Sequence, residues 1–233
     1  MRTRVKICCI SSVAEAGTAV AAGADAIGLV SAMPSGPGVI GEGLIAEIAA
    51  SAPPASGTFL LTSEVEPAAI AAQQRRCGVN TIQLCDALDA GAYPALREAL
   101  PGIALVQVIH VRDDSAVGEA MGVAPLVDGL LLDSGNPSAR VKELGGTGRV
   151  HDWALSRRIV AGAPCPVFLA GGLNPDNVGE AIHHVGPYGV DLCTGVRTDG
   201  ALAPDRLAAF MDAVAGANAA EQGAETDIGP RLG

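Results

Sequence analysis

Residues 166–196 read PVFLAGGLNPDNVGEAIHHVGPYGVDLCTGV. This stretch contains two short, mostly apolar runs, 166–170 and 189–194, and between them a segment with helical periodicity at 175–185. Runs that are apolar on both faces are typical of parallel strands covered by helices. The stretch therefore predicts a strand–helix–strand unit with parallel strands.

The same alternation extends along the chain. Six further apolar runs are expected to be strands, at 5–10, 26–30, 57–61, 80–85, 104–111 and 129–133. Helices are expected at 13–22, 43–50, 67–77, 93–99, 152–161 and 204–214, and the connection at 113–127 is short and mixed.

The number of strands and the chain length together predict the fold class. Eight parallel strands close a barrel, and 233 residues is a usual length for such a domain. We therefore predict an α/β protein with a single (β/α)8 TIM barrel over residues 1–215, a doubly wound open sheet being the alternative. Residues 216–233 lose the periodicity and are small and polar, which predicts a disordered C-terminal tail without a catalytic role.

The composition excludes some classes of partner. The formal net charge is −10 at pH 7, whereas a nucleic-acid surface needs clustered Lys and Arg. No apolar stretch approaches the roughly 18 residues of a membrane span, and MRTRVKICC at 1–9 lacks the apolar core of a signal peptide. We expect a cytoplasmic protein that binds a small molecule, and neither nucleic acid nor a membrane.

The six cysteines form neither a metal-binding nor a disulfide pattern. The sequence has no CxxC pair and no histidine at ligand spacing from a cysteine. We therefore expect no metal site, and most of these residues should be small buried hydrophobes. They are Cys8, Cys9, Cys77, Cys85, Cys165 and Cys193.

Two glycine-rich stretches follow the sixth and seventh expected strands: ELGGTGRVHDW at 143–153 and LAGGLNPDN at 169–177. The carboxyl ends of barrel strands form the active-site rim, and glycines there let backbone N–H groups approach an anion. Together with the turn after the eighth strand they predict a phosphate site, although each loop alone could be a tight turn. The expected phosphate-binding residues are Gly146, Thr147, Gly148, Gly171, Gly172, Thr194 and Gly195.

Two further residues at this rim are candidates for acid–base chemistry. Asp133 ends the otherwise uncharged run GLLLD, where a carboxylate is costly unless it faces the solvated mouth or a partner. Its expected role is general acid or base, and a helix-cap or turn aspartate is the alternative. The run VKICCI carries adjacent cysteines, of which strand alternation lets only one face the site. Cys8 is the candidate base or nucleophile.

Seven motifs, in this order and spacing, resemble the phosphoribosylanthranilate isomerase family of tryptophan biosynthesis: KICCI, GADAIGLV, TIQLCD, LLLDS, GGTGRVHDW, LAGGLNPDNV and PYGVDLCTGV. The resemblance covers residues 5–214. It implies an Amadori aldose-to-ketose isomerisation of a phosphorylated amino sugar, without cofactor or metal. It also implies that Cys8 is the general base for the C2 proton and Asp133 the general acid for the ring oxygen. Cys9, which replaces the family's usual glycine, is expected to face the helical layer.

The chain departs from this family in the half of the site that would hold the aromatic acid. The family has Ser-Pro-Arg after the second strand, and its arginine pairs with the anthranilate carboxylate; here the motif reads GPG, with Gly38 in the arginine's place. The family's QLHG reads QLCD at 83–86. Arg197 replaces a family acidic residue and is expected to supply the missing charge, a surface pair with Asp199 being the alternative. His110 is a second expected substrate contact, or a solvated rim residue.

Two other functions stay open from the sequence alone. The missing arginine favours an isomerase or lyase that acts on a different sugar phosphate. A non-catalytic sugar-phosphate-binding barrel is the other alternative, favoured only if Cys8 is dispensable or buried. A homodimer is a further prediction, although no residue in the sequence identifies its surface.

Overall fold

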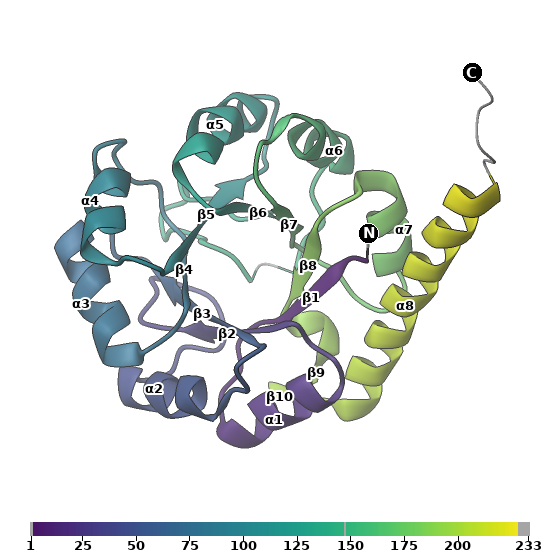
Figure 1. Ribbon diagram of the computed structural model, residues 1–233, viewed down its shortest axis with the longest axis horizontal. Helices are drawn as coiled ribbons and strands as arrows, with labels where there is room; N and C mark the ends of the chain where they lie inside the picture. Colours follow the sequence, from purple (N-terminus) through teal and green to yellow (C-terminus); the bar gives the residue numbers. More distant parts are fainter. Residues whose placement is uncertain (1, 147, 228–233) are drawn as a thin grey trace.

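The structure is a computed structural model that describes residues 2–146 and 148–227, and its eight main strands form a closed parallel barrel (Figure 1). Neighbouring strands follow the order of the sequence, and β1 pairs with β8 to close the ring. The predicted (β/α)8 barrel is confirmed, and the open sheet is excluded. The strands are β1 (Arg4–Ile7), β2 (Ala26–Val30), β3 (Gly57–Thr62), β4 (Thr81–Leu84), β5 (Ala104–His110), β6 (Gly129–Asp133), β7 (Val167–Leu169) and β8 (Gly189–Leu192).

Helices alternate with the strands and form the outer layer of the barrel (Figure 1). The mixed connection after β5 also contains a helix, followed by the short 3-10 helix η1 (Ala124–Leu126). After β8 the chain forms η2 (Thr194–Val196) and a small hairpin of β9 (Arg197–Thr198) and β10 (Ala201–Leu202). The helices are α1 (Val13–Ala21), α2 (Glu42–Ser51), α3 (Pro67–Cys77), α4 (Ala92–Ala99), α5 (Ser115–Val123), α6 (Trp153–Gly162), α7 (Val178–Val185) and α8 (Pro204–Asp227).

The buried apolar side chains form two layers, as strand alternation requires. The larger layer lies between strands and helices and includes Ile7, Ile82 and Ile182. The smaller layer fills the barrel and includes Phe59 and Phe168, whose rings meet edge to face with centroids 5.9 Å apart. Successive strand residues thus serve different layers, and the inner layer forms the floor on which a site at the strand ends is built.

The C-terminal segment differs from the prediction. Helix α8 continues from Pro204 to Asp227, so the expectation of disorder from Gly216 onward is wrong for the part of the tail that lies in this helix. Ala217 is buried, and the side-chain oxygen of Asn218 accepts a hydrogen bond from the backbone N–H of Thr3 at 2.7 Å. The segment is rich in Ala and Glu, which are strong helix formers even without an apolar face. None of the helices among the described residues has the length and apolar character needed to cross a bilayer.

Candidate active site

A cavity lies at the carboxyl ends of the barrel strands and encloses about 740 Å³, including space open to solvent. Side chains from, or directly after, all eight strands line it. Among the sequence-predicted site residues, Gly195, Arg197 and His110 do not line the cavity, and Thr147 lies outside the described residues. The predicted residues that line it are Cys8, Asp133, Gly146, Gly148, Gly171, Gly172 and Thr194.

Asp133 is the last residue of β6, and it is buried at the cavity wall with 5% of its surface exposed. This burial raises the pKa of the Asp133 carboxyl, because a desolvated carboxylate is costly. The backbone N–H of Ser134 and the neighbouring His110 act in the opposite direction but do not cancel the effect. A carboxyl group with a raised pKa stays protonated up to a higher pH than an ordinary carboxyl group. This property suits a general acid.

Cys8 follows β1 and lines the same cavity. Its backbone N–H donates to the carbonyl oxygen of Leu192 at 2.8 Å, which continues the β1–β8 pairing by one residue. Gly28 of β2 makes room for the thiol, because a Cβ at position 28 would lie 2.8 Å from the Cys8 Sγ. Strand pairing and a small neighbour therefore fix the sulfur of Cys8 at the mouth of the barrel.

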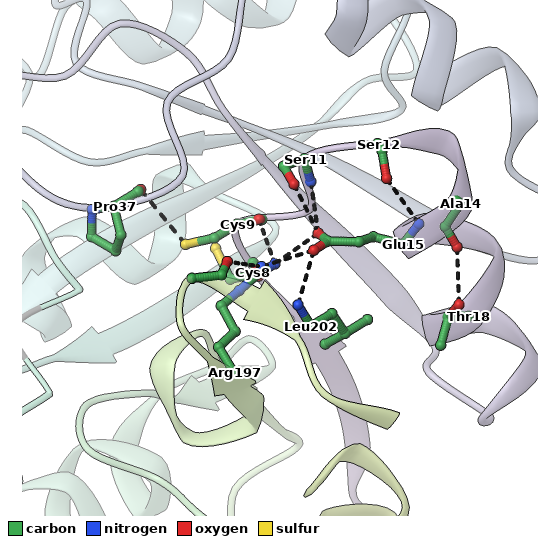
Figure 2. A network of polar contacts seen from close by, with 11 residues as sticks. Cys8, Cys9, Ser11, Ser12, Ala14, Glu15, Thr18, Pro37, Arg197 and Leu202 are labelled. Atoms are coloured by element: carbon green, nitrogen blue, oxygen red, sulfur yellow. Dashed lines mark hydrogen bonds and ion pairs between the residues drawn. The ribbon is translucent and has the colours of Figure 1, made fainter. Parts of the chain in front are cut away.

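Cys9 does not face the helical layer as the strand pattern predicts; it lines the cavity beside Cys8. The reason is that β1 ends at Ile7, so alternation no longer applies, and Cys9 has a φ of 61°. This left-handed backbone favours glycine and costs other residues on the order of 1–2 kcal/mol. The Cys9 Sγ lies 3.7 Å from the carbonyl oxygen of Pro37, where it donates a weak hydrogen bond (Figure 2).

Gly38, which stands in the place of the family arginine, is packed against Cys9. A Cβ built on Gly38 would lie 2.5 Å from the Cys9 Cβ, which is too close for any side chain to be accommodated without movement. Gly38 also has a φ of +79°, which side chains rarely adopt. The Cβ would also lie 2.9 Å from the backbone Cα of Cys9, so a side chain at position 38 requires the loop after β2 or the Cys8–Cys9 turn to move.

This contact predicts that Gly38→Ala lowers the free energy of unfolding by about 2–4 kcal/mol, from backbone strain and from overpacking against Cys9. Gly102→Ala is the matched control, because Gly102 has a φ of +83° but open space around its Cβ position. The control should lose only about 1–2 kcal/mol. Urea unfolding of Gly38→Ala with and without Cys9→Gly measures the contact. Equal losses for Gly38→Ala in both backgrounds would show that the Cys9 side chain does not contribute to the overlap.

Arg197 is a structural residue of the Cys8–Cys9 turn rather than part of the cavity wall (Figure 2). Its Nη1 and Nη2 donate to the two carboxylate oxygens of Glu15 at 3.1 and 3.0 Å, and Nη2 also donates to the carbonyl oxygen of Cys9 at 2.5 Å. Only 8% of the side chain is exposed. Arg197 forms its ion pair with Glu15 of α1 and not with the expected Asp199. Through this pair and its hydrogen bonds to the Cys8 and Cys9 carbonyl oxygens, Arg197 holds the Cys8–Cys9 turn against α1.

The Arg197–Glu15 pair makes stability depend on pH. Burial alone would raise the pKa of Glu15, but Arg197 and the backbone N–H groups of Leu202 and Ser11 lower it to about 2. Between this pKa and the ordinary value of 4.5, the unfolded chain binds more protons than the folded one, so stability rises with pH across that window.

We therefore expect Glu15→Gln to lower the free energy of unfolding at pH 7 by about 3 kcal/mol, at 1.36 kcal/mol for each pKa unit. The difference from wild type should shrink as the pH falls from about 5 to 2, where the wild-type carboxylate is protonated. Chemical denaturation at several pH values measures it. A difference that stays constant over this range would contradict the assigned ion pair.

The glycine loops after β6 and β7 pack against each other at one side of the cavity. A Cβ at Gly171 or Gly172 would lie 3.1 or 2.8 Å from backbone atoms of Arg149, so only glycine permits this approach. Gly195 supports the same region from behind, because its Cβ position would lie 2.1 Å from the carbonyl oxygen of Leu173. Neighbouring backbone segments therefore lie close together at this part of the cavity wall. Phosphate binding by these segments stays a prediction.

His110 lies beside Asp133 on the neighbouring strand and does not line the cavity. The two residues are paired in the β5–β6 register, and the His110 Nε2 lies 3.2 Å from the carbonyl oxygen of Cys85. The expected substrate contact at His110 therefore finds no support in the cavity lining. Its proximity instead affects the ionisation of the neighbouring Asp133 carboxyl.

A buried ion pair at the cavity floor is missing from the sequence prediction. Lys6 is fully buried in β1, and its Nζ lies 2.9 Å from the Asp191 Oδ1 of β8, which lines the cavity. Burial would lower the pKa of Lys6, but Asp191 more than offsets this and raises it. The available signal was a charged residue inside each of two apolar strand runs, VKICCI and GVDLCT, because such charges are retained in a core only when paired.

Comparisons with known proteins agree with this geometry. The N-(5'phosphoribosyl)anthranilate (PRA) isomerase family matches residues 5–213. The N-(5'-phosphoribosyl)anthranilate isomerase of Haloferax volcanii is 37% identical over 213 residues, covering 91% of this chain and 92% of that protein. Phosphoribosyl anthranilate isomerase from Thermotoga maritima has a similar structure, with a TM-score of 0.77 and 27% identity, covering 92% of this chain and 99% of that one.

A further crystal structure of phosphoribosyl anthranilate isomerase contains reduced 1-(o-carboxyphenylamino)-1-deoxyribulose 5-phosphate. It has a TM-score of 0.77 and 26% identity to this chain, and it covers 92% of this chain and 99% of that one. Barrel topology, the rim motifs and sequence identity over most of the chain thus lead to one assignment. The protein belongs to the N-(5'-phosphoribosyl)anthranilate isomerase family.

Proposed function

We propose that the protein catalyses the Amadori isomerisation of N-(5'-phosphoribosyl)anthranilate, the aldose-to-ketose step of tryptophan biosynthesis. The observation that carries the proposal is that Cys8 and Asp133 line one cavity together with the glycine loops after β6 and β7. The family assignment gives the reaction class. The position of both residues in one cavity supports the roles that we propose for them.

In the proposed reaction, the Asp133 carboxyl donates its proton to the ring oxygen of the ribose. The bond between C1 and the ring oxygen then breaks, and an open-chain iminium ion forms between C1 and the amine nitrogen. Cys8, acting as the thiolate, removes the proton from C2, and the electron pair moves toward the iminium nitrogen. The resulting enolamine tautomerises to the ketose, with no net gain or loss of electrons.

The phosphate of the substrate is assigned to the glycine-rich side of the cavity, which offers backbone groups and excludes side chains. A further part of the cavity wall, here called the apolar side, is lined by apolar side chains and includes Leu61, Val108 and Leu144. An aromatic ring fits this side, because its burial there removes apolar surface from water. The substrate would then cross the cavity, with C1 and C2 between Cys8 and Asp133.

Product identification tests this proposal. Purified protein is incubated with N-(5'-phosphoribosyl)anthranilate, and carbon NMR follows the appearance of a ketone at C2. Conversion to the carboxyphenylamino ketose supports the proposal, and recovery of the unchanged aldose contradicts it.

Gly38 favours a second candidate, an isomerase for a phosphorylated amino sugar whose amine carries no carboxylate. Glycine cannot make the charge-assisted contact that an arginine provides. A higher kcat/KM for the aniline analogue than for the anthranilate substrate would support this candidate. Cytoplasmic location and homodimer formation stay predictions, and sedimentation of the purified protein measures the second.

A further inference from the structure

The proposed substrate carries an aromatic carboxylate, and a residue that recognises it has to be found outside the two positions considered so far. No side chain fits at position 38 beside Cys9, and Arg197 is buried and paired with Glu15. Another cationic side chain near the apolar side of the cavity, where the aromatic ring is assigned, is therefore needed to pair with the carboxylate. This inference rests on the proposed function.

Lys142 lies on the loop between β6 and α6, and this loop is attached to the cavity rim. Its carbonyl oxygen accepts a hydrogen bond from the Ser35 hydroxyl at 2.6 Å, and Ser35 lines the cavity. Leu144, two residues further on, belongs to the apolar wall. The backbone around Lys142 therefore borders the side of the cavity that would hold the ring.

The ammonium group of Lys142 forms an ion pair with the Asp86 carboxylate. Asp86 directly follows Cys85, which lines the cavity at the end of β4. The Nζ of Lys142 thus lies between the loops after β4 and β6, and Lys142 and Asp86 border the cavity through their neighbours Leu144 and Cys85 without lining it themselves. Asp86 is one of the positions at which this chain departs from the family motif QLHG.

The ion pair leaves Lys142 available to a ligand. The Lys142 side chain is 49% exposed, whereas that of Asp86 is 12% exposed. An ammonium group has three N–H donors, so it can bind a second carboxylate or exchange one for another. A ligand carboxylate can therefore bind the exposed side of the ammonium group while Asp86 keeps its own contact with it.

We infer that Lys142 binds the carboxylate of the substrate's aromatic amine, with Asp86 holding the ammonium group in place until the ligand binds. Lys142 is then a specificity-determining residue, and it replaces from another loop the charge that is missing at Gly38. Its contribution should depend on the ligand carboxylate and not on the phosphate or the sugar.

The test compares two ligands by isothermal titration calorimetry. One is reduced 1-(o-carboxyphenylamino)-1-deoxyribulose 5-phosphate, and the other is the same compound without the carboxylate. Lys142→Met should weaken binding of the first ligand by about 10- to 100-fold, as expected for a charge-assisted contact, and change that of the second by less than about 2-fold. Asp86→Asn should strengthen binding of the first ligand, because it removes the competing carboxylate.

Arg140→Met is the matched control, since Arg140 is an exposed cation on the same loop and its removal changes the net charge equally. This variant should bind both ligands like wild type. Equal effects of Lys142→Met on both ligands, or effects equal to those of Arg140→Met, would overturn the inference while leaving the proposed function intact. A wild-type protein that binds neither ligand would overturn both.

Discussion

Asp133→Asn should lower kcat for N-(5'-phosphoribosyl)anthranilate by about 10²- to 10⁴-fold, the usual contribution of a positioned general acid. The substitution preserves the size of the side chain, but an amide cannot transfer a proton to the ring oxygen. Burial raises the pKa of the Asp133 carboxyl, and this shift favours the protonated form that a general acid needs. Steady-state kinetics measures the loss.

Binding separates this effect from a structural one. The Asp133→Asn variant should bind the reduced carboxyphenylamino deoxyribulose 5-phosphate within a few fold of wild type, because the phosphate side of the cavity is unchanged. Asp113→Asn is the matched control, since Asp113 is an exposed aspartate after β5 and should keep full activity. Full turnover by Asp133→Asn would remove this residue from the mechanism.

Cys8→Ser should lower kcat by a similar factor of about 10²–10⁴. A serine hydroxyl fits the space beside Gly28 but ionises far less readily than a thiol, so it cannot take the C2 proton. Single-turnover kinetics with the variant in excess over substrate isolates the chemical steps.

Cys165→Ser is the matched control for this experiment, because Cys165 lies just before β7, on the side of the barrel away from the cavity. It should turn over like wild type. If Cys8→Ser and Cys165→Ser have the same kcat, the base is another group, and Asp191 at the cavity floor is the next residue to substitute.

The fold was predictable because barrel strands and their helices carry local signals. Apolar runs of five to eight residues overlap the strands, which are three to seven residues long, and the rim loops follow them directly. Asp133 and the glycine loops were found for the same reason, since a polar or flexible residue at the end of an apolar run is visible in the sequence. Helix α8 was underpredicted because its last part has helix-forming residues but no apolar periodicity.

The contacts around Cys9 could not be predicted, because they depend on long-range packing and on a backbone conformation. Alternation assigns Cys9 to the outer face, and only the left-handed φ turns it into the cavity. The partner of Arg197 is Glu15, 182 residues away in sequence, and no local pattern joins them. The overlap between Cys9 and a side chain at Gly38 is likewise a matter of tertiary distance.

We expect this family member to isomerise the anthranilate substrate although it has Gly38 in place of the arginine, with Cys8 as its base. The most direct measurement is the loss of substrate fluorescence with N-(5'-phosphoribosyl)anthranilate, for wild type and Cys8→Ser side by side. We predict robust turnover by wild type and a loss of at least about 10²-fold in the variant. Absence of turnover by wild type, or undiminished turnover by Cys8→Ser, would contradict the account.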